Sequence, residues 1–204
     1  MAAGGDGVDS RRTDTRERVL AVALELFARR GYRVTSLREL AEHLGVTKAA
    51  VYFHFRTKEE ILTAILTGYL DGIAAMIADA AAEGPLTPEG QERLLRRFAA
   101  HQRGWGPDLM LLVRLNQTEI RGLPIGAEAQ QVMHSLVETL APEGAGPRER
   151  LRVRTALAAF PLAAAAALPD GDGDPDLGAD PEALQEFALA LCLEILRGGG
   201  RAAG

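Results

Sequence analysis

Apolar residues recur at intervals of three and four along most of the chain, and this period predicts helices rather than strands. The first such stripe joins Val19, Ala23, Leu26 and Phe27 and ends before Gly31. Further stripes follow, separated by glycine, proline and capping residues. The pattern predicts an all-α fold of about nine helices and no strand.

Capping residues mark the helices of the first part of the chain. Ser36 with Glu39 and Thr57 with Glu60 have the spacing of capping boxes, and Thr47 can cap a short helix between them. These signals predict, in chain order, a helix that ends near residue 30 and helices over about 37–44, 48–53 and 58–83.

Longer helices are expected in the second part. Thr87 and Asp180 each place a capping side chain before a proline, which the first turn of a helix tolerates. The expected helices cover about 87–104, 107–121, 125–140, 147–168 and 180–197. The stretch 169–179 has alternating aspartates, but it lacks the terminal glutamate of a calcium loop, so we expect a solvated linker and no metal site.

Charge is distributed unevenly around a net value of −5. Residues 10–58 hold 11 Lys or Arg against 5 Asp or Glu, whereas residues 59–204 hold 12 against 21. A basic amino-terminal part therefore precedes an acidic body. Such asymmetry favours a polyanionic partner for the first part only.

Other classes of protein lack support in this sequence. Cys192 is the only cysteine, so neither an internal disulfide nor a cysteine metal cage is expected. The longest apolar run, 156–168, is shorter than the roughly 20 residues of a membrane-spanning helix. No nucleophile elbow, zinc-protease helix or phosphate-binding glycine loop is present, so we expect no enzyme, no catalytic residue and no cofactor.

The stretch 35–55 has the pattern of a helix-turn-helix motif. Two short helices joined by a tight turn cross at the required angle when three positions are suitable. Ala41 is small where the helices approach, Gly45 can adopt the left-handed conformation in the turn, and Val51 can pack the next helix on the core. An ordinary αα-hairpin is the alternative.

These residues resemble the TetR family of bacterial transcription regulators. The similarity runs from about Thr15 to Leu62 and includes L-G-V-T-K-A-A-V-Y-F-H-F followed by K-E-E-I-L. It implies a repressor that leaves its operator when a small molecule binds; a helical ligand-binding or scaffold protein without DNA-binding activity is the alternative. We expect a disordered leader (1–10), a helix-turn-helix DNA-binding domain (11–56), a helical effector-binding and dimerisation domain (57–197) and a flexible tail (198–204).

The helix after Gly45 is expected to enter the major groove of double-stranded operator DNA. Thr47, Lys48 and Ala49 would face base edges, with Lys48 reading guanine and Ala49 offering a methyl contact. Tyr52 and His54 carry polar tips that can donate to phosphate. We expect Phe53 and Phe55, which alternate with them, to pack inward.

The resemblance adds contacts to the DNA backbone. It implies that the positions of Thr35, Ser36, Tyr52, His54 and Lys58 clamp phosphates. Arginines of the flexible arm either add contacts or form a solvated face, namely Arg11, Arg12 and Arg16. The protein is accordingly expected in the bacterial cytoplasm, on the nucleoid when it is bound to DNA.

One reading helix contacts few base pairs, so a homodimer is expected. The last two helices carry faces suited to a four-helix interface: Leu151, Thr155, Ala158 and Leu162 on one, and Leu184, Phe187, Leu191 and Ile195 on the other. The alternative is that both helices close the core of the monomer.

Polar residues on apolar stripes suggest an effector pocket. His101 shares a helix face with Phe98 and Trp105, and Asn116 interrupts the next apolar face. Buried polar groups need partners, either a ligand or groups of the chain itself. The other residues expected at the pocket are Arg114, Gln117 and Phe160. The chemical identity of the effector is left open.

Overall fold

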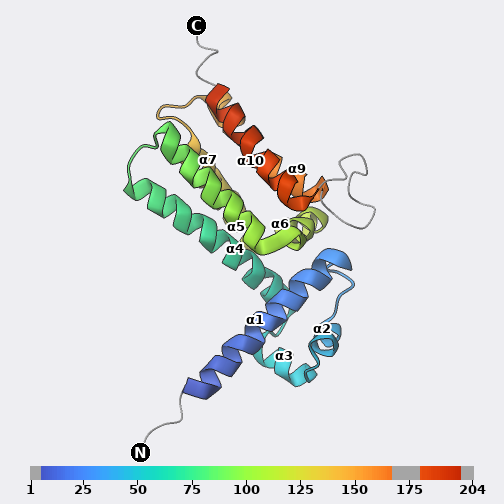
Figure 1. The fold of residues 1–204 in the computed structure, drawn as a ribbon. Helices are drawn as coiled ribbons and strands as arrows, with labels where there is room; N and C mark the ends of the chain where they lie inside the picture. Colours follow the sequence, from blue (N-terminus) through green and yellow to red (C-terminus); the bar gives the residue numbers. More distant parts are fainter. Residues whose placement is uncertain (1–5, 167–179, 199–204) are drawn as a thin grey trace, which may run out of the picture.

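The computed structural model describes residues 6–166 and 180–198. These residues form ten helices and no strand (Figure 1). Their bounds are α1 Asp6–Arg29, α2 Leu37–Leu44, α3 Lys48–His54, α4 Lys58–Ala82, α5 Pro88–Leu115, α6 Gln117–Arg121, α7 Pro124–Leu140, α8 Pro147–Leu157, α9 Ala159–Ala166 and α10 Pro181–Arg197. The all-α prediction is confirmed.

Several helix boundaries differ from the prediction. α1 begins at Asp6, so the segment expected as a disordered leader is helical from that residue. Within α5 the non-helical Gly106 breaks the helix where the sequence predicts a break, between residues 104 and 107, but the helix expected over 107–121 is divided at Asn116 into the end of α5 and α6. The helix expected over 147–168 is divided at Ala158 into α8 and α9. The predicted linker 169–179 and nearly all of the predicted tail lie outside the described residues.

The first three helices form a small unit at one end of the molecule (Figure 1). Val19, Ala23 and Phe27 of α1 are fully buried, and α1 packs against both α2 and α3. Gly45 closes α2 at φ 66°, a left-handed conformation that favours glycine. The expected roles of Gly45 and of Val51, which is fully buried, are therefore confirmed.

α4 joins this unit to the larger helical body. It is long and apolar enough to pass a length and hydropathy test for a membrane span. Its apolar residues nevertheless face other helices: Ile61, Leu62, Ile65 and Ile73 are among the most buried side chains of the protein. α4 packs against α1, α5 and α7, so packing in the core accounts for its composition.

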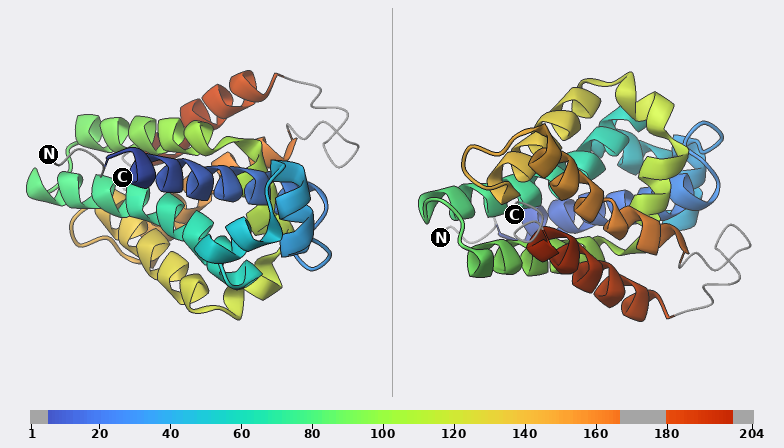
Figure 2. Two further views of the ribbon diagram at one scale, coloured as in Figure 1. Left: turned by 90° about the horizontal axis from the view of Figure 1, so that it is seen from below. Right: turned by 90° about the horizontal axis from the view of Figure 1, so that it is seen from above.

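The carboxy-terminal helices form one side of the body. α10 packs on α5, α8 and α9, and Figure 2 shows α8, α9 and α10 side by side. Cys192 of α10 is buried, and burial raises the pKa of its thiol to about 12. The lone cysteine is thus a packing residue.

Candidate nucleic-acid interface and effector cavity

Two side-chain caps position the helix-turn-helix. Ser36 accepts from the backbone N–H of Glu39, and its own N–H donates to the Glu39 carboxylate at 2.7 Å, which completes a capping box. These hydrogen bonds from Ser36 hold the pKa of Glu39 below its ordinary value. Thr47 caps α3 by accepting from the N–H of Ala50. Both capping residues stay exposed.

The first turn of α3 presents an exposed face. Thr47, Lys48 and Ala49 are all exposed, and no element in the described part of the chain covers them. The ammonium of Lys48 lies 5.1 Å from the ring centre of Tyr52, one turn further along. The groups expected to face base edges therefore project together from one end of the molecule, whereas Val51 on the opposite face is fully buried.

The aromatic residues of α3 divide between surface and core. Phe55 is buried as expected, and Tyr52 and His54 are half-buried. Phe53 is 62% exposed, so the expectation that it packs inward is wrong. Its ring lies edge-on to His54, with 5.2 Å between the ring centres. Phe53 lies in the last turn of α3, whereas Phe55 is the C-cap residue in an extended conformation, so the two rings point in different directions and only Phe55 reaches the core.

Two residues expected to contact the DNA backbone differ in accessibility. Ser36 is exposed and its hydroxyl can still donate. The Thr35 side chain is buried, and its hydroxyl donates to the carbonyl of Gly31 at 2.9 Å. A phosphate contact from the Thr35 hydroxyl is therefore incompatible with this structure, and the side chain instead holds the turn between α1 and α2.

Lys58 connects the start of α4 to that same turn. Its ammonium donates to the carbonyls of Tyr32 and Arg33 at 2.7 and 3.0 Å. It also lies 4.8 Å from the ring centre of Tyr32. Burial lowers the pKa of Lys58, and the nearby Glu39 carboxylate opposes this shift. An ammonium has three donors, so one is left for a phosphate.

Of the three arginines expected in the flexible arm, only Arg16 has a described side chain. Arg16 is exposed, and its guanidinium lies 5.3 Å from the ring centre of Phe55 at the end of α3. This contact brings a cation close to the carboxy-terminal end of α3. The side chains of Arg11 and Arg12 lie outside the described part of the structure.

The helical body contains a cavity of about 350 Å³. We call it the larger cavity, to distinguish it from a neighbouring one of about 210 Å³. The larger cavity is bounded by α4, α5, α6, α7, α8 and α9, and most of its lining is apolar. Its wall consists of Leu66, Tyr69, Leu70, Phe98, Gln102, Met110, Val113, Ile120, Ala129, Met133, Val137, Arg154, Leu157, Ala158 and Pro161. Of the residues predicted at an effector pocket, only Phe98 is in this wall.

His101 and Trp105 face α4 instead. His101 donates from Nε2 to the carbonyl of Tyr69 at 2.9 Å, and its ring stacks on the Tyr69 ring. Both side chains lie over Gly68 and Gly72 of α4. The two glycines leave room for an imidazole and an indole between the helices, so both rings pack on α4, and a ligand contact from them stays a prediction.

A methyl group at residue 72 would collide with this packing. In Gly72→Ala the new Cβ would lie 2.3 Å from Cε1 of His101. We expect a loss of about 1–3 kcal/mol in unfolding free energy from overpacking, reduced by up to about 1 kcal/mol of helix propensity. Urea denaturation measures this change in unfolding free energy. Gly104→Ala on the exposed surface of α5 is the control, because its new methyl group meets no neighbour and should stabilise the protein. Equal stabilisation by both variants would contradict the packing of His101 on Gly72.

Asn116 is satisfied by the chain itself. Its amide donates to the carbonyl of Leu112 at 2.8 Å and accepts a longer contact, 3.4 Å, from the N–H of Tyr32. These hydrogen bonds support a structural role in which Asn116 links α5 to the turn after α1, and a ligand contact from this residue stays a prediction. Arg114 and Gln117 are exposed away from the larger cavity, and Phe160 is fully buried against Phe98 behind its wall.

Loss of the Asn116 side chain should destabilise the protein. Asn116→Ala removes both hydrogen bonds and leaves the Tyr32 N–H without its acceptor. We expect the unfolding free energy of the ligand-free protein to fall by about 1–3 kcal/mol. Gln117→Ala at the exposed neighbouring position is the control and should change it by less than about 0.5 kcal/mol. An Asn116 variant as stable as the control would favour a ligand-binding role.

Gln102 is the polar residue that sequence reasoning missed. It lies one position after His101 and is 7% exposed, and its Oε1 has no hydrogen-bond partner. On a helix, residues 98 and 102 share a face, so the spacing to Phe98 could have indicated it. His101 was predicted at the pocket because an imidazole on an apolar face needs a polar partner. The residue that lines the larger cavity is its neighbour Gln102.

The faces expected to form a dimer interface are only partly covered within the monomer. Leu151, Leu162 and Phe187 are 64%, 69% and 65% exposed. Leu184, Leu191 and Ile195 are half-buried, and Thr155 and Ala158 are exposed. Ala158 also borders the larger cavity. Exposed apolar side chains of this size on neighbouring helices are typical of an interaction surface.

Comparisons with known proteins agree with this architecture. Residues 19–65 match the family model described as bacterial regulatory proteins, tetR family. The transcriptional repressor KstR2 of Mycobacterium tuberculosis is 38% identical over 72 residues, which cover 35% of this chain and 34% of KstR2. The regulator AcrR of Shigella flexneri is 44% identical over 52 residues, 26% of this chain and 24% of AcrR. The aligned parts thus cover about a third or less of the length of these relatives.

Solved structures extend the similarity to the helical body. The TetR-family regulator PfmR of Thermus thermophilus is 26% identical with a TM-score of 0.65, covering 88% of this chain and 97% of PfmR. A TetR-family regulator of Bordetella parapertussis, at 19% identity and a TM-score of 0.64, shares the fold. Fold and site define an all-α helix-turn-helix protein. Residues 19–65 form the helix-turn-helix domain of the TetR family of bacterial regulatory proteins, and the whole fold is similar to that of TetR-family regulators.

Proposed function

We propose that this protein is a sequence-specific DNA-binding regulator of transcription, a repressor released from its operator by a small molecule. The exposed first turn of α3 carries the proposal. Thr47, Lys48 and Ala49 are exposed on a helix whose opposite face is anchored by Val51. A helix exposed in this way fits the major groove, and the proposal assigns contacts with the flanking phosphates to Ser36, Tyr52, His54 and Lys58.

The regulator acts as a homodimer joined through α8, α9 and α10. One α3 helix reads too few base pairs to select an operator from a genome, whereas a two-fold dimer reads two half-sites. The exposed apolar residues Leu151, Leu162 and Phe187 supply the surface for this contact. The dimer acts in the bacterial cytoplasm and is associated with the nucleoid when it is bound to DNA.

The effector acts through the segment that separates the larger cavity from the DNA-binding unit. Met110, Val113 and Ile120 line the larger cavity, and Asn116 and Glu119 of the same segment contact Tyr32 and Arg33. Lys58 binds the same two residues from the start of α4. A ligand that prefers a different position of this segment would therefore shift the turn between α1 and α2 and the spacing of the two α3 helices.

A gel-shift assay with the promoter fragment upstream of its own gene tests the function. We expect the folded dimer to shift this fragment at concentrations that leave unrelated DNA of equal length unbound. A folded dimer that shifts neither fragment at low salt would contradict the proposal. That result would favour a helical ligand-binding or scaffold protein without DNA-binding activity.

A further inference from the structure

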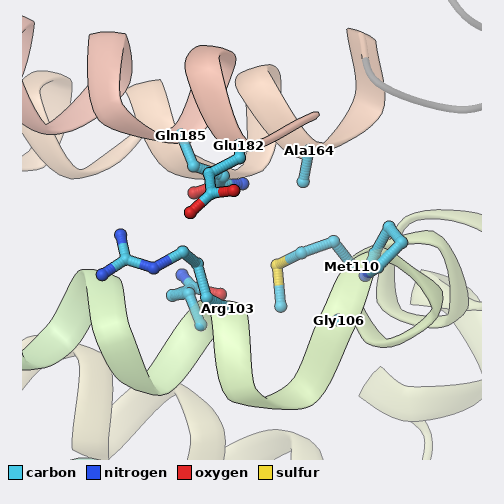
Figure 3. Close-up of a pocket in the computed structure, with 8 residues that line it drawn as sticks. Arg103, Gly106, Met110, Ala164, Glu182 and Gln185 are labelled. Atoms are coloured by element: carbon cyan, nitrogen blue, oxygen red, sulfur yellow. The ribbon is translucent and has the colours of Figure 1, made fainter. Parts of the chain in front are cut away.

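Two cavities of the helical body share part of their walls. Besides the larger cavity, a smaller cavity of about 210 Å³ lies between α5 and the pair α9 and α10 (Figure 3). Its wall consists of Gln102, Arg103, Gly106, Pro107, Met110, Ala164, Glu182 and Gln185. Gln102 and Met110 line both cavities. A single elongated molecule that passes these two side chains could therefore occupy both.

The kink of α5 forms part of the smaller cavity. Gly106 has φ 74°, a left-handed conformation open to glycine, and Pro107 after it has no N–H to donate to the preceding turn. Both residues are in the wall of the smaller cavity. In Figure 3, Glu182 and Gln185 project from α10 toward α5, and Met110 projects toward them. The space lies where the kink interrupts the regular packing of α5.

Two buried acceptors at the smaller cavity have no partner. Among the described residues, only Gln102 Oε1 and Gln185 Oε1 are buried side-chain polar atoms without a hydrogen bond. Both residues line the smaller cavity, and the Gln102 side chain is more than nine-tenths buried. Buried polar atoms in native proteins are almost always paired. Two unpaired acceptors beside one cavity thus indicate a ligand that donates hydrogen bonds.

Charge and polarity limit the ligand further. The smaller cavity has one cationic and one anionic side chain, Arg103 and Glu182, so it holds no net positive charge for an anion. In the larger cavity Arg154 is the only charged wall residue and is itself exposed, and the remaining wall is apolar except for Tyr69 and Gln102. The larger cavity therefore suits an apolar body, and the smaller one suits a head that donates hydrogen bonds.

We propose that the effector is an elongated amphiphile with an apolar body in the larger cavity and a hydroxyl or amino head in the smaller one. The head donates to Oε1 of Gln102 and Oε1 of Gln185. This assignment rests on the effector-binding role proposed above and specifies its chemistry. It also explains why a polar residue is buried on the face of α5 that otherwise presents Phe98 to the larger cavity.

A matched series of ten-carbon probes tests the head group. Isothermal titration calorimetry of the DNA-free protein compares decan-1-ol, 1-aminodecane, 1-methoxydecane and decanoate. Trp105, the only tryptophan, lies one turn from Gln102 and gives a fluorescence readout. We expect the alcohol and the amine to bind roughly tenfold more tightly than the ether, which cannot donate, and than the carboxylate. Equal affinities, tightest binding of decanoate, or no binding of any probe would overturn the assignment.

Variants of the two glutamines test whether their side chains cause the preference for a head group that donates hydrogen bonds. In Gln102→Leu the preference for alcohol over ether should disappear while the ether still binds, and in Gln185→Leu it should weaken. Gln91→Leu is the control, since this glutamine of α5 already donates to the carbonyl of Leu140 and lies outside both cavities. An unchanged preference in folded Gln102→Leu and Gln185→Leu proteins would overturn the proposal. Failure to bind promoter DNA would count against the regulator function alone, because the calorimetry contains no DNA.

Discussion

Phe187→Glu should convert the dimer into monomers and lower operator affinity by at least about two orders of magnitude, because a monomer reads only one half-site. Phe187 is 65% exposed on α10, and Leu151 and Leu162 add exposed apolar surface on α8 and α9. A carboxylate at residue 187 would face its symmetry mate or apolar surface across a two-fold contact, where burial of an unpaired charge is strongly unfavourable.

Analytical ultracentrifugation and fluorescence anisotropy with operator DNA measure the two effects. Leu115→Glu is the control: Leu115 is also a large apolar residue, 50% exposed, but it lies at the end of α5 away from this surface. It should remain a dimer and bind the operator. A dimeric Phe187→Glu protein, or a natural protein that is monomeric at micromolar concentration, would contradict the interface and favour closure of the monomer core by these helices.

Lys48→Ala should remove selectivity at one position in each half-site. Lys48 is exposed in the first turn of α3, and a lysine there can donate to guanine acceptors in the major groove. The loss is expected at about 1–3 kcal/mol per half-site, which for two half-sites is a fall of at least about 30-fold in operator affinity. Binding to random DNA should change much less.

Lys58→Ala provides the contrast. Lys58 lies beside the turn after α1 and has one donor left for a phosphate, so its loss should weaken specific and random DNA alike. Anisotropy titrations of both variants against the operator and a scrambled duplex compare the losses. If Lys48→Ala lowers affinity for both duplexes equally, Lys48 is a phosphate contact and its assigned role is wrong.

Local sequence signals predicted the helix-turn-helix well. The capping roles of Ser36, Thr47 and Thr57 depend on residues only three positions apart, and the structure shows each of these hydrogen bonds. The turn at Gly45 and the burial of Val51 follow from the same short range. Such features are legible in a sequence because neighbours along the chain determine them.

Contacts between distant segments could not be predicted in this way. Asn116 meets the backbone of Tyr32 across 84 positions, and His101 meets α4 across 32. The space at Gly68 and Gly72 that holds Trp105 and His101 depends on how α4 and α5 pack together, which no local pattern in the sequence specifies. Polar residues on apolar faces were correctly identified as needing partners, but helix packing decides whether the partner is the chain or a ligand.

The DNA-reading role of α3 is tested most directly by the salt dependence of binding to the promoter fragment and to a scrambled duplex. If each subunit contacts about four phosphates, the logarithm of operator affinity should fall with the logarithm of salt concentration at a slope near −7. The operator should also remain at least about a thousandfold preferred over the scrambled duplex. Equal affinity for both duplexes, or an affinity that does not change with salt, would contradict a DNA-reading role for α3.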